Sequence, residues 1–337
     1  MQFLSELPAT MQAIEVDAGH QLQFVSRPLP ALRSGEVLVK VAAAGVNRAD
    51  LVQRAGFYPP PPGDSDILGL EVAGTVVAVA GDEDHHADAH WLGADVFGLV
   101  PGGGYAQYVR VPVAHLLQRP VEMPVTTAAG FAEVFLTAYQ AMFSLGGLAA
   151  GQAVLLHAGA SGVGTAAIAL AKAAGAFVAV TVGSDDKAAA CLALGADVAV
   201  NYKTTDFVTV LKDAVPQGFH VVVDPVAGDY LPKNLQLLAL DGRIVVLAML
   251  GGRTVPAFDL TQMFKKRGQL LCSTLRNRTD DYKSALIADF MQQFGLQLQS
   301  ASLSPVIAQV LPWQQADHAH QLLAGNQLVG KVVLTVD

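Results

Sequence analysis

The chain has 337 residues, of which 52% are hydrophobic and 15% are charged, and its formal net charge is −8. This composition excludes a disordered chain and leaves room for two domains, while the acidic balance argues against nucleic acid as a partner. The two cysteines, Cys191 and Cys272, form no CxxC pair, and no apolar run is long enough to span a membrane. We therefore expect a cytoplasmic protein with no membrane partner, no disulfide framework and no structural zinc site.

The first predicted element begins at Met11, because residues 1–10 follow no clear pattern. We therefore expect the functional chain to start at Met11 and residues 1–10 to be dispensable. Residues 11–120 contain short β-like runs, such as 36–41 and 72–79, which are separated by turns rich in Gly, Pro and Asp. This part of the sequence predicts a β-rich domain.

Around Thr126 the pattern changes to an alternation of helices and strands. Helical patterns separate most of the apolar runs that predict strands, which are 153–157, 177–182, 198–201, 220–224, 243–248 and 269–273. Such an alternation predicts a parallel, doubly wound sheet with helices on its faces.

The rest of the chain returns to mixed structure. We expect a helix over 280–294, a second helix near 314–324 and a closing strand over 330–336. The C-terminal tail is therefore predicted to complete the N-terminal β-rich domain. The predicted division is a first domain of residues 1–125 and 273–337, with a nucleotide-binding domain of residues 126–272 inserted into it.

The most informative motif is the glycine-rich run from His157 to Gly164, between the strand at 153–157 and a helix that starts at Thr165. Glycines leave room for the backbone to approach a pyrophosphate, and the N-terminus of the following helix attracts its negative charge. The run therefore predicts a dinucleotide-binding turn. The alternative is a tight turn between strand and helix that binds nothing.

The second strand of this domain predicts which dinucleotide binds. It ends at Gly183 and Ser184 without the carboxylate that holds the ribose 2′-hydroxyl in many NAD sites. Ser184 and Lys187 lie where a 2′-phosphate would lie, and Tyr202, after the next strand, can close the same pocket. The pattern favours NADPH over NADH. The alternative is an exposed lysine at a helix start and a half-buried tyrosine.

Several motifs in this order resemble the zinc-free quinone oxidoreductases, a family of the medium-chain dehydrogenase/reductase superfamily that includes the ζ-crystallins. The matching segments are 45–51, 54–60 and 68–74. Together with 159–164 and 274–278 they look most similar to the tumour-suppressor-inducible quinone oxidoreductase subgroup.

The resemblance implies an α/β protein in which a doubly wound Rossmann domain is inserted in a GroES-like β-rich domain, with the active site in the cleft between them. It also implies NADPH as the cofactor and a quinone or another conjugated carbonyl compound as the hydride acceptor. The family commonly forms homodimers through the last strands of the nucleotide domain, so we expect a homodimer.

The resemblance further implies roles for individual residues. The pyrophosphate turn comprises Ser161, Gly162, Val163 and Gly164, and the 2′-phosphate pocket comprises Gly183, Ser184, Lys187 and Tyr202. The positions that line the ribose and nicotinamide are Thr137, Leu247, Met249, Leu250 and Leu275. The candidate catalytic residues are Asn47, which is also expected to contact the cofactor, and Tyr58.

Zinc-dependent members of the superfamily have Cys and His where this chain has Asn47 and Leu70, so we expect no catalytic metal. Asn47 and Tyr58 are expected to donate hydrogen bonds to the oxyanion that develops on the acceptor. The alternatives are a turn cap for Asn47 and loop packing for Tyr58, and we interpret Glu71 as structural. Three functions stay open: a quinone reductase, a reductase of enones or 2-alkenals, and a non-catalytic NADPH-binding redox sensor.

Overall fold

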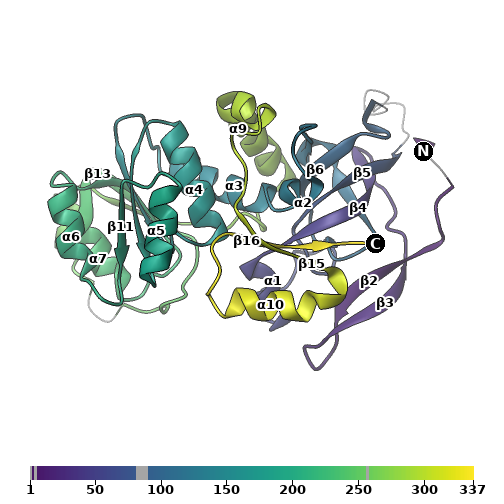
Figure 1. Cartoon of the computed structure of the whole chain (residues 1–337), viewed down its shortest axis with the longest axis horizontal. Coiled ribbons are helices and arrows are strands. Elements are labelled where there is room, and N and C mark those ends of the chain that lie inside the picture. Colours follow the sequence, from purple (N-terminus) through teal and green to yellow (C-terminus); the bar gives the residue numbers. More distant parts are fainter. Residues whose placement is uncertain (1, 4–5, 81–89, 256–257) are drawn as a thin grey trace. The chain divides into compact units, whose positions relative to one another are not determined.

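The computed structural model describes residues 2–3, 6–80, 90–255 and 258–337. The chain divides into two compact units (Figure 1). Unit 1 comprises Met1–Val134 and Arg276–Asp337, and unit 2 comprises Phe135–Leu275. The first boundary therefore lies within helix α3 (Ala132–Tyr139), whereas the sequence analysis placed it earlier, at residue 126.

Unit 1 is built mainly of β-strands. They are β1 (Gln2–Phe3), β2 (Thr10–Val16), β3 (Leu22–Pro28), β4 (Glu36–Val46), β5 (Glu71–Val79), β6 (Asp95–Leu99), β7 (Tyr108–Pro112), β8 (Leu116–Gln118), β15 (Ile307–Pro312) and β16 (Lys331–Thr335). Among the described residues, the main sheet has the order β15-β16-β4-β5-β6-β8, with β1 beside β5 and β7 beside β4. Strands β2 and β3 form a separate antiparallel pair.

The predicted return of the C-terminal segment to the β-rich domain is visible in the strand pairing. Strand β16 pairs antiparallel with β4, so that Val332 lies opposite Val46. Figure 1 shows the yellow strands β15 and β16 beside the purple strand β4. Val39, Val72 and Val332 are fully buried in the core that these strands share. Residues from opposite ends of the sequence thus form one core.

The N-terminal segment takes part in the sheet as well. Strand β1 pairs with the far end of β5, Gln2 lying opposite Val79, and β2 begins one residue before Met11. The expectation that the functional chain starts at Met11 stays a prediction.

The helical segments of unit 1 are short except for one. They are α1 (Arg48–Arg54), η2 (Val113–His115), α2 (Val125–Ala128), α9 (Asp280–Gln299), η4 (Trp313–Gln315) and α10 (Ala316–Ala324). Helix α9 starts where the sequence predicts, capped by the Thr279 side chain, but it continues past residue 294. Buried Phe290, Phe294 and Leu298 extend its apolar stripe past Gly295, so the helix is longer than the expected 280–294.

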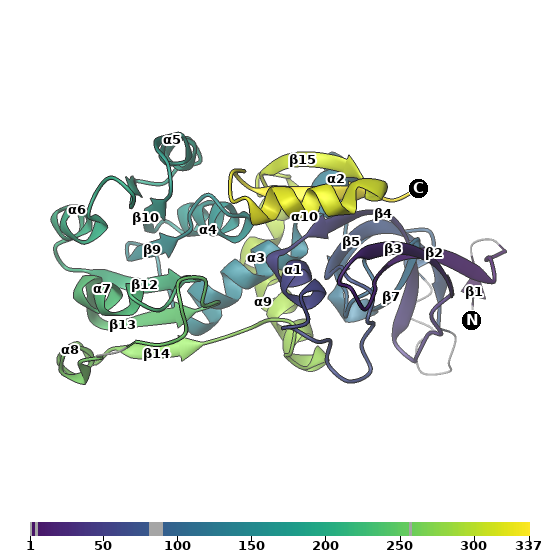
Figure 2. The ribbon, with the colours of Figure 1, turned by 90° about the horizontal axis from the view of Figure 1, so that it is seen from below.

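The strands described in unit 2 form one parallel sheet. They are β9 (Ala153–His157), β10 (Phe177–Val182), β11 (Val198–Asn201), β12 (Phe219–Asp224), β13 (Leu238–Val246) and β14 (Gln269–Cys272). Their order is β11-β10-β9-β12-β13-β14, and Figure 2 shows β10, β9, β12, β13 and β14 one below another. Successive strands are added on one side of β9 as far as β11, and the chain then returns to the other side of β9 for β12, β13 and β14. This change of direction is typical of the doubly wound dinucleotide-binding fold.

Helices alternate with these strands. The helices between successive strands are α4 (Gly162–Ala173), α5 (Asp185–Ala193), α6 (Phe207–Ala214), α7 (Tyr230–Leu237) and α8 (Leu260–Lys265), while α3 and its π-helical continuation η3 (Gln140–Leu145) precede β9. The predicted α/β fold, with a parallel Rossmann-like sheet and a separate β-rich domain, is confirmed. Within the described ranges, no helix combines the length and the apolar character that crossing a lipid bilayer requires.

Candidate functional site

The glycine-rich turn lies between β9 and α4 in unit 2, as the sequence predicts. Ser161 is the N-cap of α4, and its hydroxyl oxygen accepts a hydrogen bond of 3.0 Å from the backbone N–H of Gly164. Ala158, at the start of the turn, has a left-handed backbone with φ of 55°. The first turn of α4, which begins at Gly162 and Val163, therefore opens directly from a tight turn at the carboxyl end of a central strand.

Two of the glycines permit close packing, Gly164 against the backbone of the turn and Gly159 against the Val180 side chain. A Cβ atom on Gly164 would lie 2.4 Å from the Gly159 carbonyl oxygen, and a Cβ on Gly159 would lie 2.6 Å from the Val180 Cβ. No side chain fits at either position without moving the main chain. The turn thus has the features that a pyrophosphate needs, namely a bare backbone and a helix N-terminus.

A second group of predicted residues gathers after β10. Gly183 follows this strand, and a Cβ placed on it would lie 3.1 Å from the Tyr202 hydroxyl oxygen. Ser184 is the N-cap of α5 and accepts a hydrogen bond from the backbone N–H of Lys187. The four residues expected at a 2′-phosphate therefore lie within one small region of unit 2.

Lys203 belongs to the same region, although the sequence analysis did not select it. Its Cε would lie 3.5 Å from a Cβ on Gly183. Burial lowers the pKa of Lys187, and the positive charge of Lys203 lowers it further. Two ammonium groups that repel each other beside a tyrosine hydroxyl and a helix N-terminus fit a phosphate dianion.

The remaining predicted cofactor residues lie near the carboxyl ends of β13 and β14 or in α3. Leu247 directly follows β13, and its N–H donates to the Asp224 carbonyl at the end of β12. Met249 and Leu250 are 59% and 60% exposed, whereas Leu275 is buried and Thr137 is half-buried in α3. Exposed apolar side chains at the carboxyl ends of parallel strands are typical of a ligand-binding edge.

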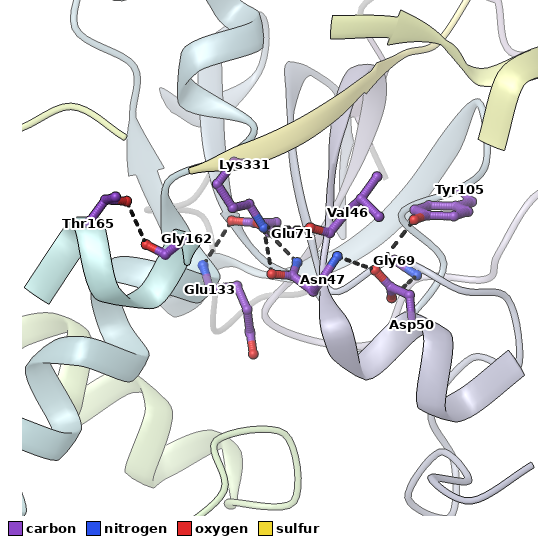
Figure 3. A network of polar contacts seen from close by, with 10 residues as sticks. All are labelled: Val46, Asn47, Asp50, Gly69, Glu71, Tyr105, Glu133, Gly162, Thr165 and Lys331. Carbon is purple, nitrogen blue, oxygen red and sulfur yellow. Dashed lines mark hydrogen bonds and ion pairs between the residues drawn. The ribbon is translucent and has the colours of Figure 1, made fainter. Parts of the chain in front are cut away.

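Asn47 lies in unit 1 in a buried polar cluster (Figure 3). Its side-chain Nδ2 donates to Glu71 Oε1 at 2.9 Å, and its Oδ1 accepts from Lys331 Nζ at 2.5 Å. Lys331 also donates to the Val46 carbonyl at 2.8 Å and forms an ion pair of 2.7 Å with Glu71. The three donors of the ammonium are thus all used, as a buried cation requires.

This pairing fixes the orientation of the Asn47 amide. Lysine can only donate and an ionised glutamate can only accept, so Oδ1 must face Lys331 and Nδ2 must face Glu71. In the part of the chain that the structure describes, the second N–H of Nδ2 has no partner. Asn47 is also the N-cap of α1, where it forms a capping box with Asp50, so the predicted turn cap and the contacts to Lys331 and Glu71 occur together.

Glu133 adjoins this cluster through its main chain. Its N–H donates to Glu71 Oε2 at 2.9 Å, while Figure 3 shows its own side chain pointing away from Glu71. Burial, and then the negative charge of Glu71, raise the pKa of Glu133 to about 8. Glu133 is therefore mostly protonated at neutral pH and adds little charge to the cluster.

Asp50 links the cluster to a second buried group. Its Oδ2 accepts from the Asn47 backbone N–H at 2.7 Å, and its Oδ1 accepts from the Gly69 N–H at 3.1 Å. Tyr105, whose hydroxyl lies 3.4 Å from Asp50 and 3.2 Å from His320 Nε2, completes this group. Burial raises the pKa of Asp50 to about 6 and lowers that of His320 to about 4. These contacts hold the start of α1, where Asn47 lies.

Tyr58 lies in the loop after α1 and is half-buried. The guanidinium carbon of Arg276 lies 5.3 Å from the centre of its ring, and Arg276 Nη1 lies 3.4 Å from its carbonyl oxygen. The loop around Tyr58 is therefore held by Arg276, which the sequence analysis used only to identify the family.

Residues that could bind a metal do not gather in the described part of the molecule. No group of three or more His, Cys, Asp or Glu side chains there has the proximity that a metal ion requires.

Two family models match the chain. The alcohol dehydrogenase GroES-like domain matches residues 33–121, and the zinc-binding dehydrogenase domain matches residues 162–291. Among curated proteins, prostaglandin reductase-3 of Mus musculus is 32% identical over 299 residues, which cover 84% of this chain and 77% of that protein. The chain belongs to the medium-chain dehydrogenase/reductase superfamily.

As a medium-chain dehydrogenase/reductase, the chain is an NAD(P)-dependent oxidoreductase by family. It is 29% identical over 314 residues to quinone oxidoreductase of Homo sapiens, covering 92% of this chain and 91% of the relative. It is also 34% identical over 246 residues to the synaptic vesicle membrane protein VAT-1 homolog of Rattus norvegicus, a match that spans 72% of this chain and 60% of that protein. The GroES-like domain expected from the sequence is confirmed, whereas the tumour-suppressor-inducible subgroup stays a prediction.

Solved structures of this superfamily are similar over nearly the whole chain. A mycobacterial protein complexed with NADPH has a TM-score of 0.83 and 29% identity, with 96% of this chain and 99% of that chain covered. An NAD-dependent alcohol dehydrogenase has a TM-score of 0.83 and 28% identity, with 97% and 100% covered. The fold of this medium-chain dehydrogenase/reductase is thus shared by proteins that are described with either cofactor.

Proposed function

We propose that this protein catalyses NADPH-dependent, zinc-independent reduction of quinones by hydride transfer. The observation that carries the proposal is the Asn47 amide, which a buried Lys331–Glu71 ion pair orients and which retains one N–H donor. In zinc-dependent relatives this position belongs to a metal ligand, so a fixed hydrogen-bond donor replaces a Lewis acid.

The cofactor-binding residues are proposed to lie in unit 2. The N-terminus of α4, which begins at Gly162, suits a pyrophosphate. Lys187, Lys203 and Tyr202 favour a cofactor that carries a 2′-phosphate, which NADPH has and NADH lacks. When bound, NADPH supplies the hydride.

The acceptor-binding residues are proposed to lie in unit 1. Hydride transfer to one carbonyl group of a quinone places negative charge on an oxygen, and the free N–H of Asn47 and the hydroxyl of Tyr58 donate to it. A proton from solvent then neutralises this oxygen, and a second proton shift, from the carbon that received the hydride to the other carbonyl oxygen, gives the aromatic hydroquinone. A quinone is already electrophilic, so positioning and hydrogen bonding suffice without a metal ion.

Reduction of enones or 2-alkenals is the second candidate function. It is favoured by the similarity to prostaglandin reductase-3, at 32% identity. A conjugated carbonyl compound also accepts a hydride and develops charge on its oxygen, so the same donors serve both reactions.

An NADPH oxidation assay with a panel of quinones, enones and 2-alkenals tests the proposal. We expect the highest kcat/KM with quinones and no effect of a metal chelator on the rate. Preference for enones would establish the second function. If NADPH binds but no acceptor oxidises it, both reductase functions are contradicted, and the non-catalytic redox sensor is the remaining function. Activity that is lost to EDTA and restored by zinc would overturn the zinc-independent mechanism.

The Gly162→Val variant provides the control for this assay. Its added side chain occupies space that the pyrophosphate needs at the first turn of α4, so we expect loss of NADPH binding with the protein still folded. Normal affinity for NADPH in this variant would remove the turn from the proposed site.

We also propose that two copies of the chain pair through β14. This strand is an edge of the described sheet of unit 2, and Leu270 on it is 41% exposed. Leu260 and Phe264 on the preceding helix α8 are 68% and 84% exposed. A bare edge beside apolar side chains favours self-association. Light scattering is expected to give the dimer mass at micromolar concentrations, and the monomer mass there would refute the pairing.

A further inference from the structure

Arg276 is a buried cation whose hydrogen bonds are incomplete. Arg276 is only 6% exposed, and its Nη1 donates a hydrogen bond to Gln53 Oε1 at 2.6 Å. The other two nitrogen atoms, Nε and Nη2, are buried and have no hydrogen-bond partner among the described residues. Buried polar groups in proteins are nearly always paired, so two such atoms on one side chain call for a missing ligand.

No carboxylate of the described chain fills this need. Within those residues, none lies within 4.0 Å of Arg276, whereas Arg54 pairs with Asp317 at 2.7 Å and Arg119 pairs with Asp95 at 2.6 Å. Burial raises the pKa of Asp64, and the charges of Lys283 and Arg276 oppose that shift without a direct ion pair. Arg276 therefore keeps a buried positive charge that no neighbour neutralises by contact.

The two unpaired atoms define the shape of the ligand. Nε and Nη2 lie on the same edge of the guanidinium plane, and their N–H groups point in parallel. This edge matches the two oxygens of a carboxylate, which it binds through two parallel hydrogen bonds. Phosphate has the same chemistry, but the proposed cofactor phosphates already have donors in unit 2, at the N-terminus of α4 and at Lys187 and Lys203.

The neighbours of Arg276 connect it to the acceptor. The guanidinium packs over the ring of Tyr58 and holds the Tyr58 loop and the Gln53 side chain on α1, the helix that starts after Asn47. The unpaired edge therefore belongs to the part of unit 1 that carries both residues proposed to contact the acceptor oxygen.

We propose that Arg276 anchors a carboxylate of the acceptor, so that the preferred substrate is a conjugated carbonyl compound that carries a carboxylate group. This inference rests on the proposed function and narrows its substrate class. The carboxylate neutralises the buried guanidinium, and the distance from it to the conjugated carbonyl sets which compounds bind productively.

Matched acceptors test the proposal. A quinone or enone that carries a carboxylate is compared with its methyl ester, which keeps the size and loses the charge. We expect the wild-type protein to prefer the acid at least tenfold in kcat/KM. Arg276→Gln is expected to lower the acid-to-ester ratio of kcat/KM at least tenfold, while the lost support of the Tyr58 loop lowers kcat/KM for both acceptors alike. Arg276→Lys keeps the charge without the paired edge and is expected to fall between.

Arg278 offers a matched control two residues along the chain, since its guanidinium packs over the Tyr282 ring at 4.5 Å. Arg278→Gln is expected to leave the acid-to-ester ratio unchanged. The dissociation constant for NADPH should be unchanged in Arg276→Gln. A parallel loss of NADPH affinity would assign Arg276 to the cofactor and overturn the proposal.

A binding measurement keeps the test independent of turnover and of the variants. Calorimetry on the wild-type protein loaded with NADPH is expected to detect the saturated, unreactive acid of the same skeleton and not its methyl ester. Equal binding of acid and ester, or binding of neither, contradicts the anchor. Reduction of neutral quinones without a preference for acids would also contradict it while the proposed reductase function stands. Binding of the acid without reduction of any acceptor would support the anchor and contradict the reductase.

Discussion

The two units build their candidate binding regions in different ways. In unit 2, the candidate phosphate-binding turn uses main-chain groups and the N-terminus of α4 within one contiguous stretch, from β9 to α4. In unit 1, the polar cluster uses buried side chains from distant segments, since Asn47 and Lys331 are 284 positions apart. The first arrangement depends on backbone geometry, and the second depends on matched charges.

This difference determines how each region responds to mutation. A backbone site fails when a side chain is added, because the space between main chains is already filled, as at Gly164. A charge cluster fails when a side chain is removed, because its partner stays buried without a counter-ion. Gly45 in unit 1 is an example of both cases, because a Cβ there would lie 2.2 Å from Glu71 Oε1 and an added side chain would disturb the charge cluster. The predictions below test this contrast.

The largest effect is expected for Lys331→Met. It leaves the Glu71 carboxylate, which is 0% exposed, without its cation, and should lower the free energy of unfolding by about 3–5 kcal/mol. Denaturant unfolding measures this loss. Adding Glu71→Gln should recover part of it. Lys172→Met in unit 2 breaks a half-exposed ion pair with Asp197 and should cost about 1 kcal/mol or less, so equal losses would remove the contrast.

The pH dependence of stability provides the second test. Because the folded-state pKa of Glu133 is about 8 and its ordinary value is 4.5, the folded state binds its proton more tightly. The contribution of Glu133 to the free energy of unfolding is thus complete below pH 4.5 and is lost as the pH rises to about 8. Because the group is half-buried, we expect this loss to be roughly 1–3 kcal/mol. Asp50, with a pKa of about 6, adds a loss of the same sign. Unfolding measured at pH 5 and pH 8 should show a smaller difference in Glu133→Gln, and an unchanged difference would show that Glu133 titrates normally.

The cofactor preference depends on Lys187, which is half-buried in unit 2, and should be affected less than the stability of the buried cluster. Lys187→Ala is expected to weaken NADPH binding by about 1–3 kcal/mol and to leave NADH binding nearly unchanged, because only NADPH carries the 2′-phosphate. Fluorescence titration with both cofactors measures this difference. Lys172→Ala, at the far end of α4, is the control and should alter neither affinity. Equal losses for both cofactors in Lys187→Ala would contradict the phosphate pocket.

The smallest effect is expected for Tyr58→Phe. A single neutral hydrogen bond contributes about 0.5–1.5 kcal/mol, so turnover should slow or KM should rise by up to about tenfold, with NADPH affinity unchanged. Tyr282→Phe, in α9, is the control. Kinetics in Tyr58→Phe that match those of the wild type would assign Tyr58 to loop packing.

Sequence alone predicted the backbone-built region well. The strands and the turn from His157 to Gly164 are encoded locally, by apolar runs and glycines with fixed spacing. Lys203 was overlooked although it directly follows Tyr202, because its proximity to Gly183 depends on how β11 ends.

The charge cluster could not be predicted in the same way. Lys331 begins an apolar strand, and a lysine at such a position indicates a buried cation that needs a partner. Only the pairing of β16 with β4 shows that this partner is Glu71. Arg276 stood in a recognised motif without an assigned role, because its missing hydrogen bonds are visible only once its neighbours are known. Glu133 gave no signal, since its raised pKa arises from burial.

The place of Lys331 in the chain has a consequence for biosynthesis. A ribosome completes all the described strands of unit 2 by Cys272, well before it adds Lys331. Until then Glu71 is a carboxylate in an apolar sheet that lacks its cation, and β4 lacks its neighbour β16. Unit 2 is therefore able to fold while the chain is still attached, whereas unit 1 must wait although its first strands are made earliest. Chaperones that meet the nascent chain are expected to bind the N-terminal strands for longest.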